Sequence, residues 1–356
     1  MFSILMISNK DINGKIFGGL QVLQRNYNAL CYNNSLVYFN LFDHYKISVL
    51  SKRMNLLFGR YYALSNENEQ KILKLCENMD FVWIDSAQYG KLAKVIKQKY
   101  PLKKIITFFH NCEYEYIKQE HPYNLIRQYI IKKNEEWACK YSDKVIVLNG
   151  NDKLTVQRLY GRVADAIIPV SFSNKSIDFS KEEISSIPTA LFLGSNFYAN
   201  IHGIKWFIEK VLPFVNIRLK IIGKDMNKAN LPKNNKLEII GYVENLEKTM
   251  QNADFMIFPI FQGGGMKVKT CEALMHGKNI IGTGEAFRGY EINLEKTGAK
   301  CETEEEFIKA INEFPKRFTS KFNEYSRNVF LEKYSNDVIF KLFAEIFEKF
   351  KMEFSI

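Results

Sequence analysis

The sequence predicts an α/β protein with two doubly wound parallel sheets. Short apolar runs alternate with segments of helical periodicity, and this pattern restarts after a polar, Ser-rich stretch at residues 173–188. Runs that are apolar throughout and separated by helices are typical of parallel strands covered on both faces. A chain of 356 residues, 46% of them apolar, is long enough to bury two cores.

The first half, residues 1–173, is predicted to form the first domain. Its expected strands are residues 2–7, 36–42, 81–84, 105–109, 144–148 and 166–168. Its clearest helical periods are residues 19–32, 87–99 and 124–141. Each period links two apolar runs, as the crossover helices of a parallel sheet do.

The second half, residues 189–334, is predicted to form the second domain. Its expected strands are residues 189–194, 219–222, 237–240, 255–258 and 279–282. Its expected helices are residues 203–212, 244–251, 266–276 and 303–314. The last segment, 335–356, is amphipathic, and we expect it to pack back on the first domain.

The formal charge of +11 is unevenly placed. Residues 91–133 hold ten Lys and Arg against three Glu, a net charge of +7, with aromatic and aliphatic residues interleaved. Such a surface suits an anionic membrane or a nucleic acid, and the simpler alternative is a solvated helix face. A basic chain without a recognition module is weak support for nucleic-acid binding, and we expect none.

The cysteines and the N-terminus indicate a cytoplasmic protein. The six cysteines have neither CxxC spacing nor metal-ligand spacing, so we expect reduced thiols. Residues 2–7 are expected to form a buried strand rather than a signal peptide. No apolar run approaches the roughly 20 residues of a membrane span.

The stretch GGGMKVKTCEALMHG, residues 263–277, follows a predicted strand and opens a predicted helix. Glycines let the backbone approach a ligand closely, and a helix N-terminus offers N–H groups to a phosphate. Lys267 and Lys269 add positive charge where a helix normally disfavours it, which suggests a bound anion. Glu272 is expected to accept hydrogen bonds from vicinal hydroxyls, as on a ribose. The alternatives are a flexible loop with solvated lysines and a Lys269–Glu272 pair.

Three other strand ends carry candidate residues. His110 follows the predicted strand 105–109, where it could serve a hydroxyl-rich ligand or have a structural role. Gly18 and Gly19 stand between the loop 8–17 and a helix, and Gly194 and Asn196 end the first strand of the second half. The phosphate-binding patterns GxGxxG and GxxxxGK[ST] are missing, which disfavours a dinucleotide oxidoreductase or a P-loop enzyme. No Asp-x-Asp pair suggests a metal.

Four segments together resemble the family 4 (group 1) glycosyltransferases of the bacterial surface-polysaccharide type, which have the GT-B fold. They are residues 107–116 (TFFHNCEYEY), 141–161, 192–213 and 253–283, the last being the most specific. The resemblance implies two Rossmann-like domains facing a central cleft, with the nucleotide-sugar donor on the C-terminal domain and the acceptor on the N-terminal one.

The resemblance also assigns roles to residues. The second glutamate of the family's paired motif, which contacts the donor ribose, matches Glu272. The first would fall on Gly264, so this chain departs from the pattern, and backbone amides of residues 264–266 could substitute. The predicted catalytic residues are His110 and Lys267. The predicted donor-binding residues are Gly18, Gly19, Gly194, Asn196, Gly264, Gly265, Met266, Lys269 and Glu272.

The implied activity is retaining sugar transfer from a nucleotide-diphosphate sugar, with UDP expected as the nucleotide and no metal or other cofactor. The implied acceptor is a hydroxyl of a glycan or a polyprenyl-linked sugar in cell-surface polysaccharide or glycoconjugate synthesis. The implied location is the cytoplasm, with contact to the inner membrane face through residues 91–133. The alternatives are a non-catalytic GT-B partner of another glycosyltransferase and a nucleotide-sugar epimerase or phosphorylase.

Overall fold

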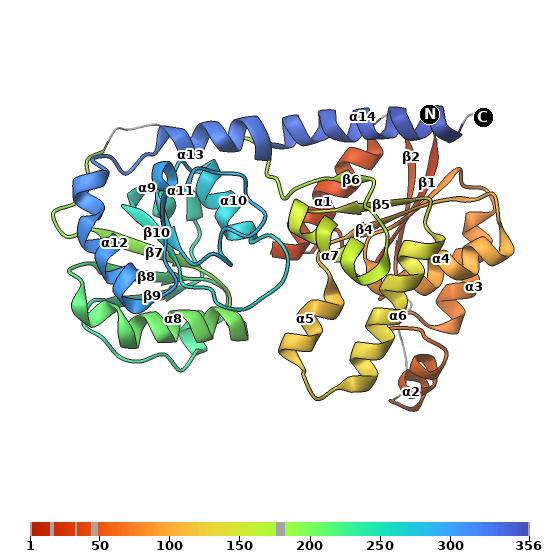
Figure 1. Cartoon of the computed structure of the whole chain (residues 1–356), viewed down its shortest axis with the longest axis horizontal. Helices are drawn as coiled ribbons and strands as arrows, with labels where there is room; N and C mark the ends of the chain where they lie inside the picture. The colour runs from red at the N-terminus through yellow and green to blue at the C-terminus, as the bar shows by residue number, and fades with distance from the viewer. Residues whose placement is uncertain (1, 15–17, 33, 44–48, 176–181, 355–356) are drawn as a thin grey trace. The chain divides into compact units, whose positions relative to one another are not determined.

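The computed structural model describes residues 2–14, 18–32, 34–43, 49–175 and 182–354 (Figure 1). The chain divides into two compact units, Met1–Pro169 with Phe340–Ile356, and Val170–Ile339. The second unit therefore begins at Val170, within the predicted first domain. Parts of the predicted loop 8–17, linker 173–188 and C-terminal segment 335–356 lie outside the described residues.

The first unit contains a six-stranded sheet in which every pairing is parallel. In spatial order the strands are β2 (Ser35–Asn40), β1 (Ser3–Ser8), β3 (Phe81–Ile84), β4 (Lys104–Phe109), β5 (Lys144–Val147) and β6 (Ala166–Ile167). All six predicted strands are confirmed. Because β2 and β3 lie on opposite sides of β1, the strand order reverses at β1 and β3. Ligands of open parallel sheets bind beyond the carboxyl ends of the strands at such a reversal.

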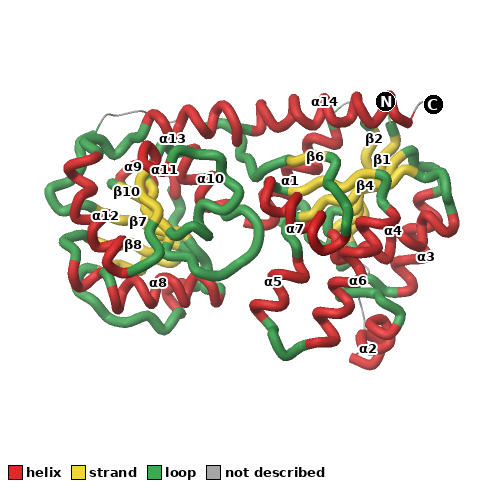
Figure 2. Tube along the Cα trace, in the orientation of Figure 1, coloured by secondary structure: helices red, strands yellow, loops and turns green. Residues whose placement is uncertain are grey.

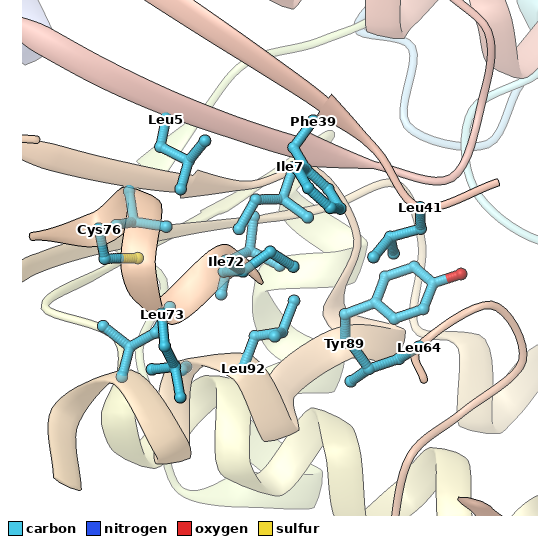
Figure 3. Close-up of a cluster of buried hydrophobic side chains, with 14 of the residues drawn as sticks. Leu5, Ile7, Phe39, Leu41, Leu64, Ile72, Leu73, Cys76, Tyr89 and Leu92 are labelled. Carbon is cyan, nitrogen blue, oxygen red and sulfur yellow. The ribbon is translucent and has the colours of Figure 1, made fainter. Parts of the chain in front are cut away.

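Helices cover both faces of this sheet (Figure 2). The helices of this unit that precede the second unit in the chain are α1 (Gly18–Cys31), α2 (Val49–Leu57), α3 (Asn66–Cys76), the short 3-10 helix η1 (Ala87–Tyr89), α4 (Gly90–Lys99), α5 (Glu113–Glu120), α6 (Leu125–Tyr141) and α7 (Gly150–Tyr160). On one face, Leu5 and Ile7 of β1 pack in a fully buried cluster with Ile72 of α3 and Leu92 of α4 (Figure 3). Burying each such side chain contributes roughly 1.5–3 kcal/mol.

The C-terminal helix α14 (Asn336–Phe354) contributes to the other face of the first sheet. The ring centroid of Trp83 in β3 lies 6.0 Å from that of Phe343 and 6.4 Å from that of Phe347. Phe347 also contacts Phe81. The alternation along β3 thus places Trp83 and Phe81 against α14, while Val82 and Ile84 join the cluster on the opposite face.

The second unit contains another parallel six-stranded sheet. In spatial order the strands are β12 (Gly298–Lys300), β11 (Ile280–Gly282), β10 (Phe255–Phe258), β7 (Thr189–Leu193), β8 (Arg218–Ile222) and β9 (Leu237–Gly241). Five of these strands were predicted. The sixth, β12, was not, because three residues are too few for a periodic signal. Here the order reverses between β7 and β10, so the carboxyl ends of these two strands mark the expected site.

The principal helices of the second unit are α8 (Tyr198–Lys210), α9 (Leu246–Asn252), α10 (Val268–Met275), α11 (Leu294–Thr297), α12 (Glu304–Arg317) and α13 (Glu324–Val329). The predicted start of α8 at residue 203 is wrong. Gly203 lies inside the helix, where an added Cβ atom would come within 1.7 Å of the Pro259 carbonyl oxygen. The glycine therefore permits close packing of α8 on the loop after β10. Within the described ranges, no helix is long and apolar enough to cross a bilayer.

Candidate functional site

The glycine loop after β10 and the start of α10 form the centre of the site in the second unit. Gly263 and Gly265 have φ angles of 133° and 60°, which L-residues with a side chain rarely adopt. The backbone N–H groups of Gly264, Gly265, Met266, Val268 and Lys269 donate no hydrogen bond to any described residue. Five donors at the start of a helix are suited to hold a phosphate group.

Lys267 is the N-cap residue of α10, and its ammonium group is hydrogen-bonded to the glycine loop. Its Nζ atom lies 2.6 Å from Oε1 of Glu285 and donates hydrogen bonds to the carbonyl oxygens of Gly265, at 2.9 Å, and Gly264, at 3.3 Å. α10 begins at Val268, two residues later than predicted. The positive charge expected to face an anion is therefore partly balanced by Glu285.

Lys269 connects α10 to the first turn of α8. Its Nζ atom donates to Oδ1 of Asn200 at 2.7 Å and lies 4.6 Å from the ring centroid of Phe192. Asn200 in turn donates to the Ser195 carbonyl oxygen. Removal from water, with a smaller effect of Lys267, lowers the pKa of Lys269 to about 7. An incoming anion would favour its charged form.

Glu272 lies in the second turn of α10, seven residues beyond Gly265. In the described parts of the chain, its half-buried carboxylate forms no hydrogen bond or ion pair. Burial raises its pKa, and the charge of Lys175 opposes this effect. The Lys269–Glu272 pair considered from the sequence is not formed, because Lys269 bonds Asn200 instead. A carboxylate that is partly removed from water and has no partner among the described residues is destabilised, so the site suits a ligand that supplies hydroxyl donors.

The other predicted residues of this unit lie in the loop after β7. A Cβ atom at Gly194 would lie 2.9 Å from Cγ of Asn200, so glycine leaves room for the side chain that holds Lys269. The backbone N–H of Asn196 donates to the Lys224 carbonyl oxygen, and its side chain is exposed. Both residues thus lie at the carboxyl end of β7, beside the strand that leads into the glycine loop.

Besides Asn200, the site contains Glu285 and Tyr290, which were not predicted either. The Tyr290 hydroxyl donates to the Lys267 carbonyl oxygen at 2.8 Å and accepts from the Cys271 N–H at 3.1 Å, so it fixes the first turn of α10. Both residues follow β11, the strand next to β10. Their position after a predicted strand was the available signal.

In the first unit, His110 pairs with an aspartate at the carboxyl edge of the sheet. Nε2 of His110 lies 2.9 Å from Oδ2 of Asp85. Oδ1 of Asp85 accepts from Trp83 Nε1 at 3.0 Å and from Asn26 Nδ2 at 2.9 Å. Burial by itself raises the pKa of Asp85, but the charge of His110 and these three hydrogen bonds outweigh it and lower the pKa. Asp85 was not predicted, although it directly follows the predicted strand 81–84.

Gly18 and Gly19 are the first residues of α1. The carbonyl oxygen of Gly19 accepts a hydrogen bond from Nζ of Lys10 at 2.9 Å, and an added Cβ atom at Gly19 would lie 2.8 Å from that nitrogen. Glycine here therefore leaves room for Lys10. Burial lowers the pKa of Lys10, and the carboxylates of Asp85 and Glu113 oppose this effect.

The described residues contain no group of three or more His, Cys, Asp or Glu side chains that could hold a metal ion. The predicted site residues form two sets, one at the reversal of each sheet. The second unit holds the glycine loop, the two lysines and Glu272. The first unit holds His110 together with the two glycines that begin α1.

Comparison with known proteins gives the site a context. Residues 187–316 match the family model described as glycosyl transferases group 1. This range lies within the second unit and includes the glycine loop, α10 and Glu272. A search of curated proteins found no match to the sequence.

Several solved structures share the fold over nearly the whole chain. Sucrose-phosphate synthase from Thermosynechococcus elongatus is 13% identical, with a TM-score of 0.74 over 99% of this chain and 100% of that one. The lipopolysaccharide outer core galactosyltransferase WaaB is 15% identical, with a TM-score of 0.69 over 98% and 99%. Anabaena HepE, in complex with UDP-glucose, is 11% identical, with a TM-score of 0.70 over 98% and 100%. With the two parallel sheets, these similarities confirm the predicted GT-B fold.

Proposed function

We propose that this protein is a retaining, metal-independent glycosyltransferase of family 4. It moves a sugar from a nucleotide-diphosphate sugar, with UDP as the nucleotide, to a hydroxyl of a glycan or polyprenyl-linked acceptor. The product belongs to cell-surface polysaccharide or glycoconjugate synthesis. The second unit binds the donor and the first unit binds the acceptor.

The observation that carries this proposal is that five available N–H groups, in the glycine loop and the first turn of α10, precede an unpartnered carboxylate on the same helix. Glu272 lies seven residues beyond Gly265, which is about two helical turns. A nucleoside diphosphate offers phosphate oxygens at one end and ribose hydroxyls at the other. The phosphate oxygens match the N–H groups, and the ribose hydroxyls match the carboxylate of Glu272. The family match to residues 187–316 and the UDP-glucose bound to HepE support the same ligand class.

The chemistry follows from this donor site. As the sugar leaves, negative charge grows on the diphosphate, and preorganised N–H groups with a nearby cation stabilise it. Lys267 and Lys269 supply the cation, the latter gaining a proton as the anion binds. His110, oriented by Asp85, is the group of the first unit that contacts the reacting sugar. Retention of configuration is read from the anomeric coupling constant of the product by NMR, and metal independence from UDP release in EDTA.

The donor assignment is tested by a thermal-shift panel of UDP, GDP, CMP and their sugars on the full chain. A ligand that binds the folded state raises the melting temperature. We expect UDP and its sugars to do so, and Glu272→Gln to remove most of the shift. Glu238→Gln, an exposed carboxylate on β9, is the matched control. Equal shifts in the wild type and Glu272→Gln would contradict the assignment.

A membrane location is proposed from an exposed apolar patch in the basic segment 91–133. The patch is made of the exposed residues Tyr123, Leu125, Ile126 and Tyr129, at and before the start of α6. Arg127 and Lys132 lie among and beside them. We expect the protein to float with anionic vesicles and not with neutral ones. The Ile126→Ser/Tyr129→Ser variant should lose binding, whereas Leu102→Ser, which is even more exposed but lies outside the patch, should keep it. If the wild-type protein binds neither the anionic nor the neutral vesicles, the proposed membrane location is wrong.

A non-catalytic GT-B partner is the second candidate, because Gly264 stands where family members carry a glutamate. It predicts UDP binding without turnover. Release of UDP from UDP-sugars by the wild type, lost in His110→Ala, separates an enzyme from such a partner. An epimerase is distinguished from a glycosyltransferase by incubation with a UDP-sugar in the absence of an acceptor, since only the epimerase then forms a second UDP-sugar.

A further inference from the structure

A cavity of about 610 Å³ lies in the first unit, within the size range of small-molecule sites. Its polar and aromatic lining comes from Asn9, Tyr61, Tyr62, Gln88, Asn124 and Arg127. Among the described residues that line it, Arg127 is the only Lys, Arg, Asp or Glu. Leu56 and Ile126 also line it, so the cavity combines aromatic rings, amides and one guanidinium with two aliphatic side chains.

The cavity lies at the functional edge of the first sheet. Asn9 follows β1, and Gln88 belongs to η1, which follows β3. These are the two strands at which the strand order reverses. The Gln88 side chain hydrogen-bonds Glu113, three residues beyond His110. The cavity and the His110–Asp85 pair thus lie at the same edge, where a parallel sheet binds ligands.

One nitrogen of the Arg127 guanidinium donates a hydrogen bond within the protein, and the other two are available to a ligand. Its Nε donates to the Tyr61 hydroxyl at 3.0 Å, and Tyr61 is only 6% exposed. The two terminal nitrogens of Arg127 donate to no other residue in the described ranges. A guanidinium fixed in this way presents a planar fork that matches the oxygens of a phosphate or carboxylate.

Tyr62 gives the cavity an aromatic face. It is 55% exposed, and its backbone has a φ angle of 46°, which is uncommon for a bulky residue. Its ring meets Phe42 edge-on at a centroid distance of 5.4 Å. A strained backbone is retained where its surroundings fix it, and such residues cluster at ligand sites. An exposed ring of this kind packs well against the C–H face of a sugar, while Asn9, Gln88 and Asn124 offer amide donors and acceptors to hydroxyls.

We infer that this cavity binds the acceptor as a sugar ring that carries a phosphate or a carboxylate, with Arg127 holding the anionic group. The inference rests on the proposed function, since it specifies the acceptor of that reaction. Glu113 is an acidic group that interacts electrostatically with Arg127. Burial raises the pKa of Glu113 to about 7, so near neutral pH it carries only part of a negative charge and repels an anion weakly.

The test is ligand-observed NMR titration of the full chain with glucose, glucuronate, glucose 1-phosphate and inorganic phosphate. We expect at least one of the two anionic sugars to bind tenfold or more tightly than glucose and than phosphate alone. Preference for glucuronate identifies a carboxylate, and preference for glucose 1-phosphate identifies a phosphate. Equal binding of the three sugars overturns the inference, and so does phosphate binding as tightly as the sugar phosphate.

Variants at Arg127 complete the test. Arg127→Gln should remove the preference for the anionic sugar, Arg127→Lys should retain part of it, and Lys132→Gln outside the cavity should leave it unchanged. A preference that survives in Arg127→Gln overturns the role of Arg127. Each variant is checked for an unchanged melting temperature and unchanged UDP binding. If the wild type fails to bind UDP but prefers the anionic sugar, the proposed function fails while the cavity assignment stands.

Discussion

Nζ of Lys267 lies 2.6 Å from Oε1 of Glu285, and the same ammonium group donates to the carbonyl oxygens of Gly264 and Gly265. Both side chains are largely buried, being 11% and 21% exposed. The pair ties the glycine loop after β10 to the segment after β11. Lys267 occupies the carbonyl oxygens of Gly264 and Gly265, so the N–H groups of the glycine loop are the backbone groups left for a ligand.

Glu285→Gln should therefore loosen the glycine loop. Loss of a largely buried charge-assisted hydrogen bond is expected to reduce the free energy of unfolding by about 2 kcal/mol. We expect UDP affinity to fall about tenfold, the equivalent of roughly 1.4 kcal/mol. Urea denaturation and calorimetric titration measure the two effects. Arg288→Gln is the control. It removes the longer contact of 3.6 Å to the other oxygen of Glu285 and leaves the contact between Glu285 and Lys267 in place. Wild-type affinity in Glu285→Gln would show that the pair does not shape the donor site.

Glu272→Gln should separate ligand binding from stability. The raised pKa of Glu272 means that its ionised form is disfavoured by folding. In the wild type, ionisation of Glu272 therefore lowers stability as the pH rises above the pKa of this group in the unfolded state. The amide of Glu272→Gln does not ionise, so the variant avoids this loss of stability. We expect the ligand-free variant to melt at or above the wild-type temperature at pH 7, with the difference vanishing near pH 4. A clear drop in melting temperature at pH 7 would mean that Glu272 has a structural partner.

Lys269 should take up a proton when UDP binds. Its pKa in the ligand-free fold is about 7, lowered from 10.5 mainly by burial, so at pH 8 the amine is mostly neutral. A bound diphosphate favours the ammonium form, so UDP affinity should fall as the pH rises from 7 to 9. Without ligand, the same shift reduces stability as the pH falls from 10.5 towards 7. Calorimetry at pH 8 in HEPES and in Tris gives the proton uptake directly. Uptake that persists in Lys269→Met excludes this lysine as its source.

Asp85→Asn should disable His110 without affecting the donor site. The aspartate accepts three hydrogen bonds in a buried position, and an amide would place an N–H group where Oδ2 now faces His110, so the imidazole loses the acceptor that fixes its Nε2–H tautomer. We expect a loss of about 2 kcal/mol in stability and a hundredfold lower rate of UDP release, with UDP affinity unchanged. His110→Gln should give the same rate loss with a smaller effect on stability. A wild-type rate in either variant would make the pair purely structural.

The strands could be predicted from the sequence because buried parallel strands are apolar throughout. Eleven strands were expected, and each corresponds to an observed one. The short strand β12 and the start of α8 were missed. Three residues carry no periodicity, and Gly203 resembles a helix boundary when the neighbouring Pro259 carbonyl is unknown.

The candidate site was predictable only in part. The glycine loop, Lys267 and Lys269 could be found because they are adjacent in sequence and follow an apolar strand. Their partners could not, since Glu285 and Asn200 reach the lysines only through the folding of neighbouring strands. The aspartate beside His110 was missed for the same reason, as 25 residues separate the two.

The most direct test of the central claim is calorimetric titration of UDP and 2′,3′-dideoxy-UDP into the wild type and Glu272→Gln. If the Glu272 carboxylate accepts hydrogen bonds from the ribose, removing the hydroxyls should weaken binding to the wild type about tenfold or more. The same change should have little effect on the variant, because the carboxylate is no longer present. An equal loss of affinity in both proteins would show that Glu272 does not contact the ribose.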